Sequence, residues 1–129
     1  MPWLQRDGEV LAAAEVAADR RDRRRGLLGR DGVTGAIVLA PCRHVHTAGM
    51  RVPIDVALCD RDGVVLRTCR LAPWRLAPVV RGVRLVVEAE AGAFARWSLR
   101  PGDRLVVVPT GVAARASAAE PIERREPAS

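Results

Sequence analysis

Residues 54–71 read IDVALCDRDGVVLRTCRL, two apolar runs joined by a short polar segment. Because runs of this length rich in Val, Ile and Leu are typical of strands, we expect strands at Ile54–Cys59 and Val64–Leu71. The joining residues Asp60-Arg61-Asp62-Gly63 are the clearest hairpin signal in the chain, since Gly63 can take the left-handed conformation of a three-residue loop. This stretch therefore predicts an antiparallel β-hairpin.

The register of this hairpin follows from its loop. It places Cys59 opposite Val65 and Asp55 opposite Cys69, so that Cys59 and Cys69 are too far apart along the ladder for a disulfide. Three cysteines, an odd number without paired spacing, fit free thiols in a reducing compartment.

Similar patterns predict further elements on both sides of the hairpin. The expected strands are Glu9–Val16, Gly35–Ala40, Val83–Ala89 and Arg104–Val108, and the expected helices are Arg20–Leu28 and one or two turns within Ala91–Trp97. Residues 71–78, with two prolines and Trp74, are expected to form a surface connection. Residues 111–129 are expected to be a disordered tail.

The fold class follows from this alternation of short strands and turns. We expect a mainly β (α+β), compact single-domain fold over residues 1–110, barrel-like, with one or two short helices. A chain of 129 residues with 49% apolar content is large enough to bury a core without disulfides.

The charge of the chain is a weak guide to its partners. All 21 basic residues are arginine, and Ala and Val are abundant, which is typical of a GC-rich bacterial genome. Few aromatic residues, and acids that interrupt the densest run Arg20–Arg30, argue against nucleic-acid binding. An acidic partner of that run, RNA or an anionic membrane surface, is kept as a third possibility.

The sequence shows neither a membrane-spanning segment nor an export signal. No apolar run reaches the length of a membrane-spanning helix, and acidic residues interrupt the N-terminal stretch, so it has no signal-peptide core. We therefore expect a cytoplasmic protein. No dinucleotide fingerprint, phosphate loop or paired-carboxylate pattern is present, which gives no warrant for a nucleotide site or a glycosidase.

The segment CRHVH (residues 42–46) concentrates possible metal ligands. If it is extended, Cys42, His44 and His46 point to one face and could bind zinc. The alternative is structural: His46 and Thr47 bond the loop Gly49–Pro53, and Cys42 packs as a small hydrophobe. We favour this alternative and predict no metal and no cofactor.

Asp55 is a carboxylate at the start of an otherwise apolar strand, where burial is costly unless its oxygens are satisfied. Structurally, it could accept N–H groups of the Gly49–Val52 loop or pair with Arg51 or another nearby arginine. Functionally, it could be a general base beside His46. We favour the structural role.

Several motifs together resemble one family. They are Arg24–Arg30 (RRGLLGR), His46–Asp55 (HTAGMRVPID), Asp62–Val65 (DGVV), Val87–Gly92 (VEAEAG) and Leu99–Asp103 (LRPGD). Over residues 9–108 the chain is similar to the domain-of-unknown-function family 192. That resemblance implies a small β-rich domain, sometimes exported, without an agreed activity. Many members have an aromatic-Met-Lys-Asn-Thr run where this chain has residues 46–50, so nothing supposed of that Asn carries over.

These observations lead to two hypotheses of function. The first is a module that binds a small ligand or a protein, through a surface with His46, Thr47, Met50, Arg51, Asp55 and Trp74. Its discriminating feature would be a contiguous exposed apolar patch. The second is a hydrolase with His46 and Asp55 as an acid/base pair, with or without a metal at Cys42, His44 and His46. Its discriminating feature would be a pocket in which those two side chains converge.

Overall fold

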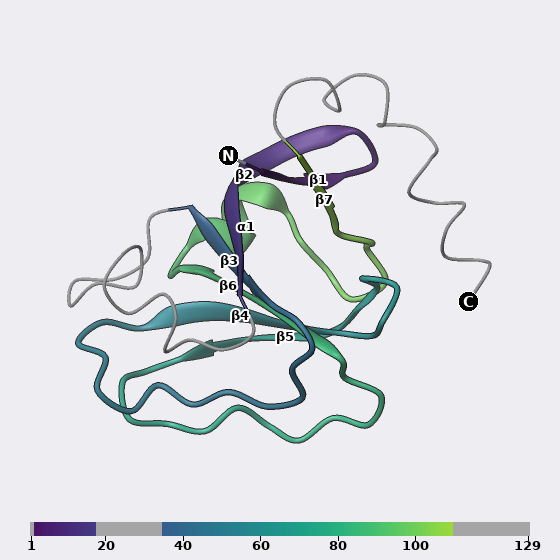
Figure 1. Ribbon diagram of the computed structural model, residues 1–129. Helices are drawn as coiled ribbons and strands as arrows, with labels where there is room; N and C mark the ends of the chain where they lie inside the picture. The colour runs from purple at the N-terminus through teal and green to yellow at the C-terminus, as the bar shows by residue number, and fades with distance from the viewer. Residues whose placement is uncertain (1, 18–34, 110–129) are drawn as a thin grey trace.

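The computed structural model describes residues 2–17 and 35–109, so the expected helix Arg20–Leu28 and the expected tail 111–129 lie outside the described residues. The elements in chain order are β1 (Trp3–Arg6), β2 (Glu9–Ala17), β3 (Ala36–Leu39), β4 (Ile54–Cys59), β5 (Val65–Leu71), β6 (Leu85–Glu90), α1 (Ala93–Trp97) and β7 (Val106–Val108). The seven strands form one sheet in the order β5-β4-β6-β3-β2-β1-β7 (Figure 1). The predicted mainly β fold with a short helix is confirmed. No helix of the described residues is long and apolar enough to cross a membrane.

The β4–β5 hairpin forms where the sequence predicted it. Gly63 has a φ of 87°, and the Asp60 carboxylate accepts hydrogen bonds from the N–H groups of Asp62 and Val64 at 2.9 and 3.0 Å. These bonds hold the loop in the conformation that reverses the chain.

The predicted register of the hairpin is correct beside the loop but wrong at the far end of the two strands. Cys59 pairs with Val65 as predicted, but Leu58 pairs with Arg67, so Leu66 is the extra residue of a β-bulge. Asp55 consequently pairs with Arg70 and not with Cys69. The bulge thus brings an arginine opposite the carboxylate.

The central strands β3, β4 and β6 are buried on both faces of the sheet. Because side chains alternate along a strand, each contributes to two separate cores. The first core lies against α1, β1 and β7, and includes Val38, Ala57, Val87 and Phe94. The second core includes Ile37, Leu39, Ile54, Val56, Leu58 and Val86. This two-sided burial explains the continuous apolar runs of the sequence.

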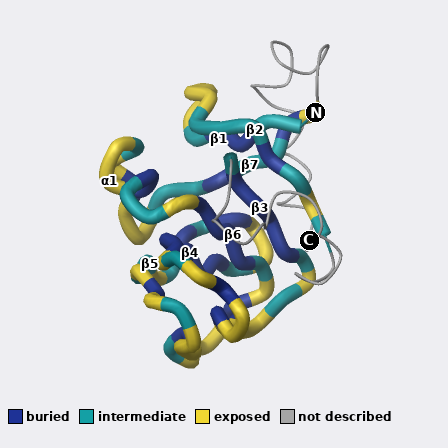
Figure 2. The backbone as a smooth tube through the Cα atoms, turned by 90° about the vertical axis from the view of Figure 1, so that its left-hand side faces the viewer, coloured by how far each residue is buried: buried dark blue, intermediate teal, exposed yellow. Residues whose placement is uncertain are grey.

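Two irregular segments, residues 41–53 and 72–84, cover the second core. They contribute Val45, Met50, Ala77 and Val83 to it from below in Figure 1. Backbone hydrogen bonds join them, from Ala77 N to the Val45 oxygen at 3.0 Å and from Cys42 N to the Arg84 oxygen at 2.8 Å. Most residues of these two segments are exposed, and they are yellow in Figure 2. We call these two segments together the loop face.

The sheet is not closed, so the expectation of a barrel was too strong. Among the described residues, its two edge strands are linked near one end, where an isolated bridge joins Val64 to Arg104 and Leu105 N donates to the Gly63 oxygen at 2.9 Å. At this junction a Cβ on Gly63 would lie 2.3 Å from the backbone oxygen of Leu105. Only a glycine allows this close approach.

Other boundaries differ from the sequence prediction. The strand β1 was missed, and β6 and β7 each begin two residues later than expected. The helix α1 falls inside the expected range Ala91–Trp97. The turn before β7 is confirmed, since the Asp103 carboxylate accepts the N–H of Arg100 at 3.0 Å.

Candidate functional site

Thr47 fixes the middle of the loop face. It is fully buried, and its hydroxyl donates to the Ala72 oxygen at 2.6 Å and accepts from Arg75 N at 2.8 Å. Its backbone N–H donates to the Arg75 oxygen at 2.9 Å, and its carbonyl accepts from Met50 N and Trp74 N at 3.1 and 3.0 Å. One threonine thus ties both segments of the loop face together, which is a structural role.

His46 lies beside Thr47 but on the outside. Its ring is exposed, and Nδ1 accepts the N–H of Ala48 at 3.1 Å. Its backbone forms an isolated antiparallel bridge with Leu76. The ring therefore turns toward its own loop.

Asp55 is buried on β4, with its side chain toward the first core. One carboxylate oxygen accepts the N–H groups of Gly92 and Phe94, both at 3.0 Å, and the other accepts from Arg70 Nε at 3.1 Å. Three hydrogen bonds satisfy a carboxylate that would otherwise be costly to bury. The contacts are of the structural kind that the sequence favoured, and Arg70 fits the expected nearby arginine. The backbone donors, however, are Gly92 and Phe94 at the N-terminus of α1 and not the Gly49–Val52 loop.

His46 and Asp55 lie on different sides of the sheet. The neighbours of His46 in the loop face, Val45 and Met50, pack in the second core, whereas Asp55 contacts Phe94 of the first core. A hollow of about 320 Å³ beside Asp55 is lined by Thr68, Cys69, Arg70, Phe94 and Ala95, without a histidine. The hydrolase hypothesis therefore stays a prediction that no described contact supports.

The possible metal ligands bind backbone groups instead of converging. Cys42 Sγ donates to the oxygen of His44 at 3.4 Å, and His44 Nε2 lies 2.8 Å from the Ala77 oxygen. Within residues 2–17 and 35–109, no three His, Cys, Asp or Glu side chains are placed to hold a metal ion. The zinc alternative at Cys42, His44 and His46 gains no support from this geometry.

Cys59 is a buried thiol whose ionisation opposes folding. Burial, with a smaller contribution from the charge of Asp60, raises the pKa of Cys59 from 9.0 to about 12. The unfolded chain thus loses this proton at a lower pH than the folded chain. The contribution of the neutral Cys59 thiol to the free energy of unfolding is therefore fully present below pH 9. This contribution is lost as the pH rises from 9 toward 12.

Alkaline unfolding tests this behaviour cleanly, because the chain contains no Lys and no Tyr. We expect Cys59 to lower the free energy of unfolding by about 1 to 2 kcal/mol between pH 7 and pH 10. Urea titrations at both pH values would measure this drop, and in the variant Cys59→Ala it should shrink by that amount. Cys69, whose pKa burial also raises, remains in both proteins as a common background. Equal pH dependence in the two proteins would contradict the buried-thiol assignment.

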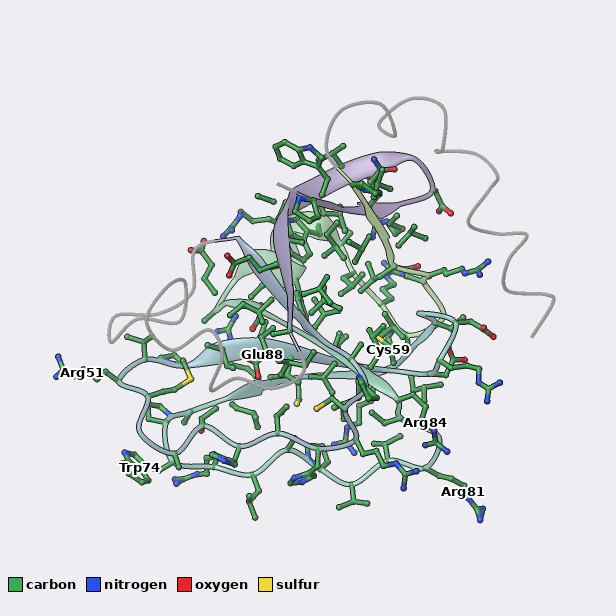
Figure 3. All side chains as sticks on the ribbon, in the orientation of Figure 1. Arg51, Cys59, Trp74, Arg81, Arg84 and Glu88 are labelled. Carbon is green, nitrogen blue, oxygen red and sulfur yellow. The ribbon has the colours of Figure 1, made fainter. Side chains whose placement is uncertain are left out.

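The outer side of the loop face is strongly basic. Its two segments contain five arginines and no Asp or Glu. All five are exposed, and none forms an ion pair with a described residue. They are Arg43, Arg51, Arg75, Arg81 and Arg84. Figure 3 shows Arg51 and Arg81 projecting outward from the edge of the molecule.

The same surface exposes large apolar side chains. Trp74, Leu76 and Val79 are 66%, 69% and 88% exposed, and they lie within six positions of one another. Of the sequence-predicted surface residues, Arg51 and Trp74 are thus exposed, whereas Met50 belongs to the core at 6% exposure. Met50 fills the second core and so contributes nothing to the contact area of this surface.

Two features escaped the sequence reasoning. The first is the exposed, basic and apolar surface around Leu76 and Val79. The absence of any Asp or Glu over residues 72–84 was visible in the sequence and indicated its basic character. The second is Glu88, fully buried on β6 between Ile37 of β3 and Val56 of β4. Its only signal was a carboxylate inside an apolar run.

A pocket of about 230 Å³ lies at the junction of the two sheet edges. Apolar residues of β1, β3, β6 and β7 form its base, and Arg61, Asp62 and Arg104 lie at its rim. None of the residues that the sequence singled out for function lines this pocket.

Two solved structures resemble this fold. One is a protein of unknown function from Novosphingobium aromaticivorans, with a TM-score of 0.65, 17% identity, and coverage of 81% of this chain and 82% of that one. The other, from Sinorhizobium meliloti, is described provisionally as a transcription regulator. It has a TM-score of 0.57, 23% identity, and coverage of 73% of this chain and 80% of that one. At these identities the likeness shows the fold alone.

Comparison of the sequence itself gives the family. No curated protein matches the chain at a significant level. The model of the uncharacterized family DUF192 matches residues 3–107, which is most of the chain and includes the loop face, both cores and the hairpin. The chain therefore belongs to the DUF192 family.

Proposed function

We propose that this chain is a binding domain that contacts a negatively charged partner through the loop face. The observation that carries this proposal is the composition of the surface: five exposed arginines and no acidic residue over two segments that lie side by side. An isolated arginine on a protein surface needs no explanation, but a field of one sign attracts ions of the opposite sign and accelerates their association.

The loop face is also held in place before any partner binds. Thr47 joins its two segments through hydrogen bonds to Ala72, Trp74 and Arg75, and Val45, Met50 and Ala77 anchor the face in the second core. Since little ordering is then required on binding, the entropic cost of association is reduced. His46 and Thr47 accordingly support the surface, while Arg51 and Trp74 belong to its contact area.

A charge-matched pair of variants tests the proposal. In the first, Arg75→Glu and Arg81→Glu change the loop face, and in the second, Arg61→Glu and Arg100→Glu change exposed arginines elsewhere. Both double variants have the same net charge, so non-specific attraction is equal. On a heparin column, which presents a polyanion, we expect the loop-face variant to elute at clearly lower salt than both the control and the wild type.

The opposite outcome is equally informative. If the two double variants elute at the same salt concentration, the loop face is not the anion-binding surface and the proposal fails. Thermal unfolding of each variant provides the folding control, and because all four positions have exposed or partly exposed side chains, little change is expected.

A further inference from the structure

The exposed apolar residues of the loop face narrow the chemistry of its partner. Among the described residues, five large apolar side chains are markedly exposed: Val10, Val16, Trp74, Leu76 and Val79. Three of these five fall in one six-residue stretch, residues 74–79, which contains Arg75 and is followed closely by Arg81. Single exposed apolar residues are ordinary on protein surfaces. Here, however, three of them lie together on the same surface as the arginines.

The backbone holds these side chains outward. Trp74 has a φ of 61°, a conformation that non-glycine residues rarely adopt, and its N–H donates to the Thr47 oxygen. Leu76 is bridged to His46, and its neighbour Ala77 turns inward, so the Leu76 side chain must turn outward. The exposure is therefore built into the backbone of the segment. Figure 3 shows Trp74 and Arg81 near the two ends of this edge, both pointing away from the sheet.

We infer that the negatively charged partner is the surface of an anionic phospholipid bilayer. This inference rests on the proposed function and specifies its partner. Anionic headgroups attract arginines, and the layer just beneath them accepts apolar side chains, with Trp favoured at the boundary. Binding of this kind depends on buried apolar area and electrostatic attraction together, which are the two properties that the loop face combines.

Other negatively charged partners fit the face less well. Single-stranded nucleic acid is bound by stacking bases on aromatic rings, but Trp74 is the only aromatic residue of the loop face. A protein partner would need a negative patch and an apolar patch placed in register with these arginines and with Trp74, Leu76 and Val79. A face without any acidic residue suits a uniformly negative, fluid surface better.

Vesicle sedimentation tests the inference directly. We expect the intact chain to sediment with vesicles containing equal parts of phosphatidylglycerol and phosphatidylcholine, and to stay in solution with pure phosphatidylcholine vesicles. Leu76→Ser combined with Val79→Ser should weaken binding to the anionic vesicles at least about tenfold, since it removes the inserted surface but no charge. The matched control, Val10→Ser with Val16→Ser, removes exposed apolar side chains of β2 and should bind within about twofold of wild type.

The outcomes separate this inference from the proposed function. If the Leu76/Val79 variant binds the anionic vesicles as wild type does, or if the chain binds polyuridylate or polyglutamate but no vesicles, the bilayer assignment is wrong. The proposed function then stands as long as the Arg75/Arg81 variant still loses heparin binding. If the Arg75/Arg81 variant binds heparin and anionic vesicles as tightly as its charge-matched control, both proposals fail.

Discussion

Replacing Asp55 by Ala should lower the free energy of unfolding by about 3 kcal/mol, because two backbone N–H groups and Arg70 lose their acceptor at once. The N–H of Phe94 is buried, so water cannot readily take the place of the carboxylate. Asp55→Asn should cost less, since the amide oxygen can still accept the N–H groups of Gly92 and Phe94 while its NH₂ group faces Arg70. Urea unfolding of the three proteins would give this order of stability.

An exposed ion pair provides the control for Asp55. Glu90 Oε2 and Arg96 Nη2 are 2.8 Å apart, but the two side chains are 53% and 59% exposed. Glu90→Ala should therefore change the free energy of unfolding by no more than about 0.5 kcal/mol. If Asp55→Ala were as mild as Glu90→Ala, the three hydrogen bonds of Asp55 would not be what holds the N-terminus of α1 against the sheet.

Replacing Gly63 by Ala should be at least as damaging, with a loss of about 3 kcal/mol or more. A methyl group there would lie 2.3 Å from the backbone oxygen of Leu105, and backbone cannot yield as the end of a flexible side chain can. The chain must move apart at this point, which weakens the hydrogen bond from Leu105 N to the Gly63 oxygen. Thermal and urea unfolding would measure the loss.

Gly49 is the control that distinguishes the cost of the steric clash at Gly63 from the cost of the left-handed backbone conformation. It has the same φ as Gly63, 87°, but a Cβ at Gly49 would meet no atom within 4 Å. Gly49→Ala should therefore show only the cost of the left-handed conformation, about 1 to 2 kcal/mol. Equal losses in the two variants would mean that the close approach at Leu105 is relieved without penalty.

Local signals in the sequence predicted the hairpin and most strands correctly. Ile54–Cys59 matches β4 residue for residue, because a turn with its own hydrogen-bonding aspartate adjoins a clear apolar run. Trp3–Arg6 was missed because four residues of mixed polarity have no recognisable period, and it is a strand only through its pairing with β2 and β7. The bulge at Leu66 was equally invisible, because the turn residues define the pairing beside the loop but give no sign of an extra residue further along β5.

The site was predictable only in part. A buried carboxylate in an apolar strand must be satisfied, so the structural kind of contact at Asp55 followed from sequence. Its partners Gly92 and Phe94 did not, because they are 37 and 39 residues away along the chain. Conversely, the acid-free composition of residues 41–53 and 72–84 was visible in the sequence, but only the hydrogen bonds around Thr47 show that these segments form one surface.

The two ends of the open sheet bear on how the protein behaves at high concentration. An unpaired edge strand can recruit another chain by intermolecular strand addition, which is a route to aggregation. Here β7 is only three residues long, and Leu105, the residue before it, is hydrogen-bonded to Gly63 of the hairpin. The other edge, β5, is interrupted by its bulge and carries Arg67 and Arg70 in exposed positions. Both edges are thus poor templates for a second copy, so the described part of the chain disfavours intermolecular strand addition although its sheet is open.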